Sequence, residues 1–177
     1  MGYKWPKATM KKTLFTIALM MGAFAYLNAQ ITAEEIQQCR DRISQIQEAK
    51  ANMASAQTDN VDIDGFKDNA LKVCEDVVQS GNKALDLYKA TQDGGAPLQE
   101  AMELSKQLVE LGKHSADLGK QAEPAGKEIK NIKNPKVLLK AKKIISNATS
   151  AVKLTAEEIK FQVRLVNEII QTIKAKQ

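Results

Sequence analysis

The chain has 177 residues, of which 44% are hydrophobic and 27% are charged. This composition is typical of a folded globular domain, and it excludes a collagen-like chain, a disordered tail and a protein with several membrane spans. The first 29 residues hold four lysines and no acid, so the net charge falls from +5 for the whole chain to +1 for the rest, with 22 basic and 21 acidic residues. Net charge therefore does not indicate specific nucleic-acid binding.

Residues 1–29 resemble a bacterial Sec signal peptide. Lys11 and Lys12 precede an uncharged apolar run at residues 13–27, and Ala29 offers a small residue for cleavage. A run of 15 residues is shorter than the ~20 that a membrane-spanning helix needs, although an uncleaved anchor remains the alternative. We expect translation to start at Met1 or Met10, and a mature chain of residues 30–177 that is exported to the periplasm or secreted, with no transmembrane segment.

Two helices are expected in the first half of the mature chain. Thr32 and Glu35 form a capping box, and Ile31 and Ile36 can close a hydrophobic staple across it. Apolar residues then recur at helical spacing and predict a helix over 33–56. The acidic and glycine-containing segment 59–65 interrupts the periodicity, which predicts a loop followed by a second helix over 65–91.

Cys39 and Cys74 both fall on the apolar faces of these helices. An oxidising compartment would allow them to form a disulfide bond, and their spacing fits no zinc motif. If the two helices are antiparallel, however, the midpoint of the pair misses the predicted loop centre by about seven residues of register, or roughly 10 Å. We expect the bond, with two buried free thiols as the alternative.

From Pro97 the chain repeats every seven residues, and we expect a third helix there. One column of the repeat is small: Ser105, Gly112, Gly119 and Gly126. Glycine inside a helix costs about 0.5–1 kcal/mol relative to alanine, so we expect these residues to let a neighbouring helix approach closely, the alternative being a flexible element. Pro124 should kink or interrupt this helix.

Asn134 and Pro135 begin a last helix, predicted to span about 135–176 on the strongest heptad pattern of the chain, with a break near Thr155 as the alternative. No strand pattern occurs. The sequence therefore predicts an all-α fold: a single domain, residues 30–177, built as an antiparallel up-and-down bundle of about four helices, with a long coiled-coil-like hairpin made by the third and fourth.

Two motifs suit metal or haem binding only in part. Residues 60–65 resemble the start of an EF-hand loop, but the first position is Asn60 and the twelfth, which should be glutamate, is Leu71. We expect helix capping there instead. His114 is the only histidine, which excludes the histidine–carboxylate sites of di-iron bundles; a haem held by His114 with Met53 or Met102 is the remaining alternative. We predict no metal and no cofactor.

Few side chains suit catalysis. The mature chain has one histidine, two cysteines and no glycine-rich phosphate loop. Few of its side chains could therefore form a nucleophile and a general base in one pocket. The adjacent acids Glu34–Glu35 and Glu157–Glu158 are interpreted as first-turn charges or solvated surface. Three aromatic residues, Phe66, Tyr88 and Phe161, give little surface for stacking on bases. We expect no enzymatic activity.

Charge is unevenly distributed along the mature chain. Residues 30–100 carry a net charge of −6 and residues 101–177 a net charge of +7. The basic excess gathers where the third helix meets the fourth, at Lys127, Lys130, Lys133, Lys136, Lys140, Lys142 and Lys143. In an up-and-down bundle the acidic loop with Asp59, Asp62, Asp64 and Asp68 lies at the same end, so mutual neutralisation is one hypothesis. The other is that the basic tip projects and binds an anionic partner.

We therefore expect an exported binding protein whose partner is an unknown protein or an anionic component of the cell envelope. Two other hypotheses remain at this stage, a periplasmic holdase chaperone and a membrane-active toxin-like bundle. The sequence leaves oligomerisation open.

Overall fold

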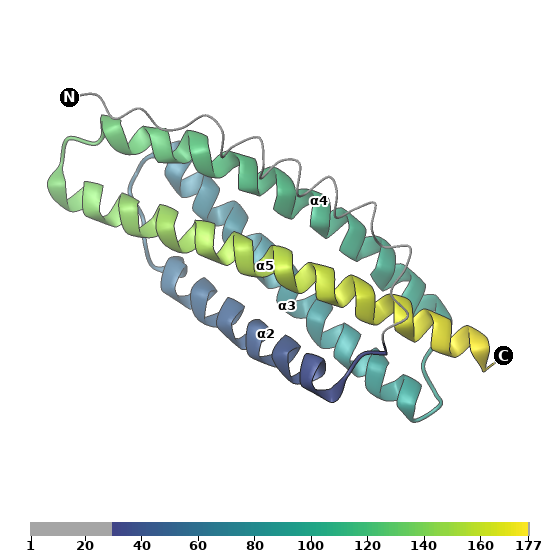
Figure 1. The fold of residues 1–177 in the computed structure, drawn as a ribbon. Helices are drawn as coiled ribbons and strands as arrows, with labels where there is room; N and C mark the ends of the chain where they lie inside the picture. Colours follow the sequence, from purple (N-terminus) through teal and green to yellow (C-terminus); the bar gives the residue numbers. More distant parts are fainter. Residues whose placement is uncertain (1–29, 177) are drawn as a thin grey trace, which may run out of the picture. The chain divides into compact units, whose positions relative to one another are not determined.

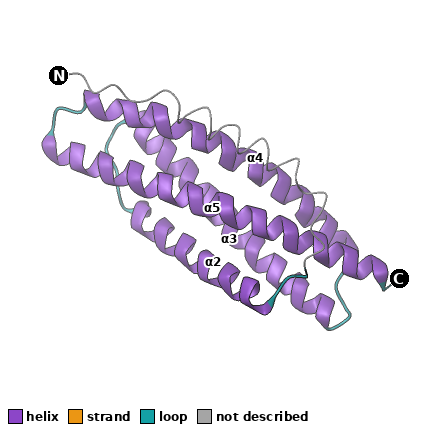
Figure 2. Cartoon of the chain, viewed as in Figure 1, coloured by secondary structure: helices purple, strands orange, loops and turns teal. Residues whose placement is uncertain are grey.

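The computed structural model describes residues 30–176, and there the chain consists of four long helices and one short 3-10 helix. The elements are α2 (Ala33–Ala54), α3 (Val61–Gln92), α4 (Leu98–Glu128), η1 (Ile129–Asn131) and α5 (Pro135–Ala175). No strand occurs in this part of the chain (Figure 2). The four helices pack side by side as a bundle (Figure 1), so the all-α prediction is confirmed. The predicted signal peptide lies outside the described residues.

The beginnings of α2 and α3 are set by their caps. The Thr32 hydroxyl accepts a hydrogen bond from the Glu35 amide at 3.2 Å, and the Glu35 carboxylate accepts one from the Thr32 amide at 3.0 Å, which is the predicted capping box. Helix α3 begins four residues earlier than predicted. The Asn60 side chain accepts from the amides of Asp62 and Ile63, so the acids expected to break the helix lie instead in its first turn, where the helix dipole favours them.

Helix α4 continues through Pro124, so the helix is not interrupted there, and a kink at Pro124 stays a prediction. Proline removes one backbone hydrogen bond, and α4 ends only four residues later, at Glu128, before the 3-10 turn η1. Helix α5 spans 41 residues without the alternative break at Thr155. The Thr155 hydroxyl is buried and donates to the carbonyl of Val152 at 2.9 Å, so the hydroxyl is satisfied inside the unbroken helix.

The core follows the predicted apolar columns. Phe66, Leu104, Leu108, Leu165 and Ile169 belong to one large cluster to which all four helices contribute. Helix α5 packs against each of the other three helices, because buried residues recur along it from Ala141 to Ile173. A smaller cluster of Ile63, Ala141 and Ile144 closes one end.

The small column of α4 does not serve the packing role expected of it. A Cβ atom added to Gly112 would meet only Ile159 Cγ2, at an ordinary 3.8 Å, and one added to Gly119 or Gly126 would meet no described atom within 4 Å. No neighbouring helix of this chain therefore needs these glycines. The close approach occurs instead at Gly81 of α3, where a Cβ would lie 2.6 Å from Gln162 Nε2 and 2.7 Å from Ile43 Cδ1.

Replacement of glycine by alanine should stabilise the protein at Gly119 and Gly126 and destabilise it at Gly81. Gly119→Ala and Gly126→Ala should each raise the free energy of unfolding by about 0.5–1 kcal/mol, because alanine favours the helix and its methyl group enters open space. Gly81→Ala should lower it by about 1–3 kcal/mol because the methyl group overpacks the core. Urea denaturation of dilute protein measures all three, and a stabilising Gly81→Ala would contradict the packing described for α3.

Candidate functional site

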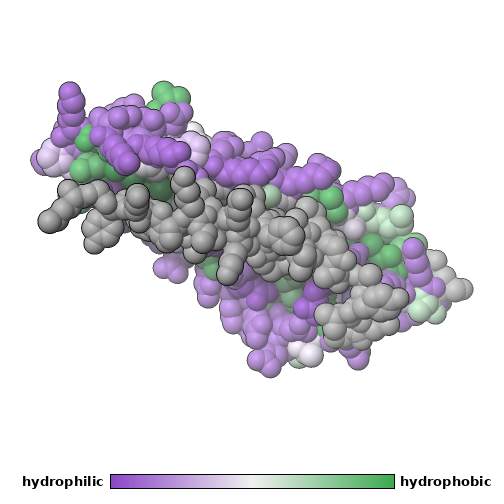
Figure 3. All heavy atoms as spheres, turned by 45° about the horizontal axis from the view of Figure 1, so that its top comes forward, coloured by the Kyte–Doolittle hydropathy of each residue, from purple (hydrophilic) through white to green (hydrophobic). Residues whose placement is uncertain are grey.

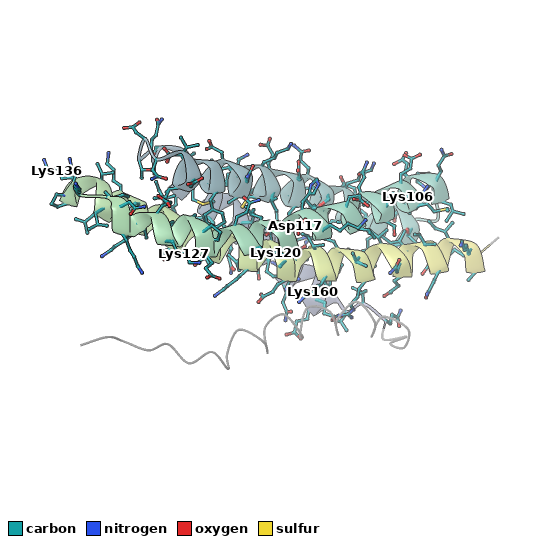
Figure 4. All side chains as sticks on the ribbon, turned by 90° about the horizontal axis from the view of Figure 1, so that it is seen from above. Lys106, Asp117, Lys120, Lys127, Lys136 and Lys160 are labelled. Carbon is teal, nitrogen blue, oxygen red and sulfur yellow. The ribbon has the colours of Figure 1, made fainter. Side chains whose placement is uncertain are left out.

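Seven lysines gather around the connection from α4 to α5, and we call this set the basic turn. Lys127 lies in the last turn of α4, Lys130 in η1 and Lys133 just after it; the other four, in the first turns of α5, are Lys136, Lys140, Lys142 and Lys143. All seven residues are exposed. Figure 4 shows Lys136 at the end of the helices, with Lys127 further back along α4.

The acidic loop between α2 and α3 lies against the base of the basic turn, as predicted. Ile63, in the first turn of α3, packs with Ala141 and Ile144, and Ile129 and Ile132 pack around them. Ala141 lies six residues, about 9 Å, into α5. The connection from α4 to α5 therefore extends beyond the connection from α2 to α3 (Figure 1).

Proximity does not lead to ion pairing between the two loops. Within residues 30–176, no lysine of the basic turn has an acidic-loop carboxylate within 4.0 Å. Lys127 pairs with Glu123 of its own helix at 3.0 Å, and Asp68 pairs with Lys67 at 3.2 Å. Six ammonium groups of the basic turn thus remain available to a partner.

The carboxylate of Asp64 is used for capping rather than left open. It accepts hydrogen bonds from the amides of Thr58 and Asp59 and from the Thr58 hydroxyl, at 2.9–3.2 Å. Asn60 caps α3 in turn. Both side chains thus hold backbone amides at the start of α3, and the capping interpretation of residues 60–65 is confirmed.

Two apolar side chains are exposed at the same end of the bundle. Leu139 of α5 is 69% exposed, and Val61, the first residue of α3, is 87% exposed. Leu139 has Lys136, Lys142 and Lys143 three and four residues away, which places all of them on one helical face. Figure 3 shows small apolar patches between hydrophilic residues at this end, on the left of the view. The exposed surface at this end is therefore mainly cationic, with exposed apolar side chains among the lysines.

A buried polar cluster joins α2 to α5. The Glu158 side chain is fully buried, and its carboxylate accepts hydrogen bonds from Arg42 Nε at 2.7 Å, from Cys39 Sγ at 2.9 Å and from Gln162 Nε2 at 3.1 Å. The Arg42 guanidinium also lies over the ring of Phe161, 5.2 Å from its centre. The interpretation of Glu158 as solvated surface is wrong, because Glu158 shares a helical face with the buried residues Thr155, Phe161 and Gln162, whereas Glu157 is exposed.

The same cluster extends to α3. Gln162 Nε2 also donates to the carbonyl of Val77 at 3.0 Å, and the Ser80 hydroxyl donates to Gln162 Oε1 at 2.6 Å. Gly81 leaves the space into which the Gln162 amide fits. A cluster with every group hydrogen-bonded in this way fixes the alignment of helices more strictly than apolar contacts do.

Neutralising the buried carboxylate tests this cluster. Glu158→Gln puts an amide donor where three donors converge, and it leaves the Arg42 charge, which keeps 21% of its side-chain exposure, without its partner. We expect the free energy of unfolding to fall by about 3 kcal/mol.

Glu157→Gln is the matched control, since Glu157 is the exposed neighbour, and it should change stability by less than about 0.5 kcal/mol. Urea denaturation of the two variants makes the comparison, and equal midpoints would contradict the structural role of Glu158.

Cys39 and Cys74 are free thiols, so the predicted disulfide bond is absent. The cause is the alignment of α2 with α3. Lys50 pairs with Glu75 at 3.1 Å, so Cys74 lies level with the part of α2 near residue 50. Cys39 lies some 11 residues from there, about 17 Å along the helix, far beyond the reach of a disulfide bond. The mismatch in register between Cys39 and Cys74 therefore explains why the disulfide bond does not form.

Burial makes both thiols poor nucleophiles. Burial raises the pKa of Cys74 to about 11. The pKa of Cys39 is raised further, by burial and then by the hydrogen bond to the Glu158 carboxylate and its negative charge. Since the thiolate is the reactive form, neither cysteine is set up for catalysis.

The raised thiol pKa values predict a loss of stability at high pH. Below the thiol pKa of the unfolded chain, about 8.5–9, both states are protonated and stability is unaffected. Between there and the folded pKa of Cys74, about 11, only the unfolded chain ionises, so the free energy of unfolding falls as pH rises. Cys74→Ala should flatten this fall over the same range, measured as the change in urea midpoint with pH.

Thiol alkylation gives an independent measurement. At neutral pH the folded protein should resist iodoacetamide at both positions, and urea without reductant should expose both. Rapid modification of the folded chain would contradict the burial of Cys39 and Cys74.

A groove of about 540 Å³ runs between α3 and α4, and His114 lies on its wall. The other lining residues include both charges, from Asp76, Lys83, Lys106 and Glu110. Met53 is fully buried in the core and is not among the groove residues, so the structure does not bring it together with His114. A groove of mixed charge favours no particular ligand.

Among residues 30–176, no three histidine, cysteine or acidic side chains are grouped as metal ligands would be. None of the described helices is both long enough and apolar enough to span a membrane. Comparison of the chain with protein-family models, curated proteins and solved structures finds no match. The function is therefore inferred from the chain's own surface.

Proposed function

We propose that the four helices form an antiparallel up-and-down bundle, with α4 and α5 as a long coiled-coil-like hairpin. The contacts between α2 and α5 support this arrangement, since residue numbers rise along one helix as they fall along the other. Ile31 donates to Glu168 at 2.8 Å, Glu35 pairs with Arg164 at 3.0 Å, and Arg42 pairs with Glu158. The hairpin carries the basic turn at its tip.

We propose that the protein is an exported, non-enzymatic binding protein that holds an anionic partner through the basic turn. The observation that carries this proposal is the exposure of seven lysines at one end, six of them without an ion pair among the described residues. Charges of one sign at one end of a protein attract and orient a partner of the opposite sign. A partner in the periplasm or outside the cell follows from the signal-peptide pattern.

The position of the lysines supports binding rather than structural use. A lysine needed for stability is held by a carboxylate or a carbonyl, as Lys67 is held by the carbonyl of Ala56 at 2.8 Å. Nothing comparable holds Lys133, Lys136 or Lys140 in the described residues. These side chains keep their conformational freedom in solution and would lose it only on contact with a partner, which favours adaptable recognition of an anionic surface over a single rigid pocket.

Removing four charges from the basic turn tests the proposal. Lys133→Gln, Lys136→Gln, Lys140→Gln and Lys143→Gln together should weaken binding of the mature protein to heparin, a polyanion, at low salt. The variant should elute at clearly lower salt because long-range attraction depends on the clustered charge.

The control removes four exposed lysines elsewhere, at Lys72, Lys153, Lys174 and Lys176. It has the same net charge as the first variant, so it should retain nearly wild-type binding if clustering matters. Equal retention of the wild type and the basic-turn variant would refute the proposal. A pull-down from the cell envelope with the same pair of variants would then identify the partner.

A further inference from the structure

We propose that α4 carries a second, outward-facing heptad seam through which two copies of this chain pair in antiparallel orientation. The first seam of α4 faces the core, and its buried residues are Ala101, Leu104, Leu108, Leu111, Ser115, Leu118 and Ala125. The second seam is the same heptad pattern shifted by one residue, which rotates it by about 100° around the helix.

Two columns make up the second seam. One tapers in size and consists of Met102, Val109, Ala116 and Glu123; the other is small and consists of Ser105, Gly112, Gly119 and Gly126. Met102 is 43% exposed and Val109 is 51% exposed, so the described part of the chain leaves two large apolar side chains of this seam largely uncovered. The open space beside Gly119 and Gly126 lies next to them on the same face.

The two columns complement each other when a second copy runs in the opposite direction. In an antiparallel heptad pair each residue of one column faces a residue of the other. With the two-fold axis level with residue 114, Met102 faces Gly126 of the second copy and Val109 faces its Gly119. Ala116 then faces Gly112, and Glu123 faces Ser105. Each large side chain thus meets a residue with little or no side chain, and every position of the seam has a partner.

A column of lysines flanks the seam on one side. Lys106, Lys113, Lys120 and Lys127 follow one another at seven-residue intervals along α4, and Figure 4 shows three of them in order along the helix. Within one copy, Lys113 pairs with Glu110 at 2.7 Å and Lys120 with Asp117 at 2.6 Å. In the antiparallel pair this lysine column borders the same column of the second copy, and Lys113 lies about 3 Å along the axis from both Lys113 and Asp117 of that copy. The ion pairs within each copy therefore have to offset the repulsion between the two lysine columns.

Complementarity of size, with Met102 and Val109 each facing a glycine, therefore favours a second copy over an unrelated helix as the occupant. The seam extends over 25 residues of α4, roughly 36 Å, and offers only one helix face. That is smaller than a standard protein interface, so we expect a reversible dimer that forms as concentration rises.

Sedimentation velocity over about 1 µM to about 1 mM protein, a range that covers weak interfaces, tests the pairing. The mature wild-type chain should shift from monomer to dimer. Gly119→Leu should weaken dimerisation at least about tenfold, because leucine cannot fit against Val109 of the second copy. The substitution adds a side chain in open space within the monomer, so the thermal midpoint should stay equal or rise.

Gln107→Leu is the matched control, since Gln107 is an exposed α4 residue outside the seam, and it should dimerise like the wild type. A spin label at Gln99→Cys reports orientation, because the native thiols are buried. The antiparallel alignment separates the two labels by about 45 Å along the axis, and a parallel one by less than about 20 Å. A wild type that stays monomeric throughout, a dimer unchanged by Gly119→Leu, or a short label distance would each overturn the proposal.

Discussion

The carboxylate of Glu158 has no access to solvent, and a buried charge of this kind is tolerable only where cationic and hydrogen-bonding partners surround it. Arg42 and Cys39 of α2 and Gln162 of α5 supply those partners, and Gln162 extends the contacts to Val77 and Ser80 of α3. Sliding any of the three helices by one turn would separate these groups. The alignment of α2 with α5 therefore depends on Glu158, and Gln162 beside it aligns α3 with α5.

Helix α4 is attached differently. Among the described residues, one side-chain hydrogen bond joins α4 to another long helix, from Asn69 to Gln121 at 3.2 Å on the surface. Apolar packing along its leucine column supplies the rest. Apolar contacts tolerate small shifts better than buried polar ones do, so α4 is the helix that could shift most easily against the other three.

Much of the fold was predictable from the sequence because local signals determine it. The capping box at Thr32 and Glu35, the proline that begins α5 and the heptad columns each act within a few residues, and the structure contains all three. The missed features depend on three-dimensional neighbours. Gly81 and the glycines of α4 look alike in sequence, yet only Gly81 lies against another helix. Likewise, Glu158 differs from Glu157 only by the 100° that turns it towards Arg42. The basic turn was predicted by clustering alone, and its binding role stays a prediction.

The place of the basic turn at one end of the bundle, where α4 connects to α5, determines what a pair of molecules could reach. If two copies associate along α4 in opposite directions, their cationic tips lie at opposite poles, with the Lys130 residues some 48 Å apart along the axis. A single molecule then has one cationic end, whereas a dimer is a rod with a cationic basic turn at each end. Such a dimer would link two negatively charged surfaces at a fixed distance. The linkage would appear only above the protein concentration at which dimers form.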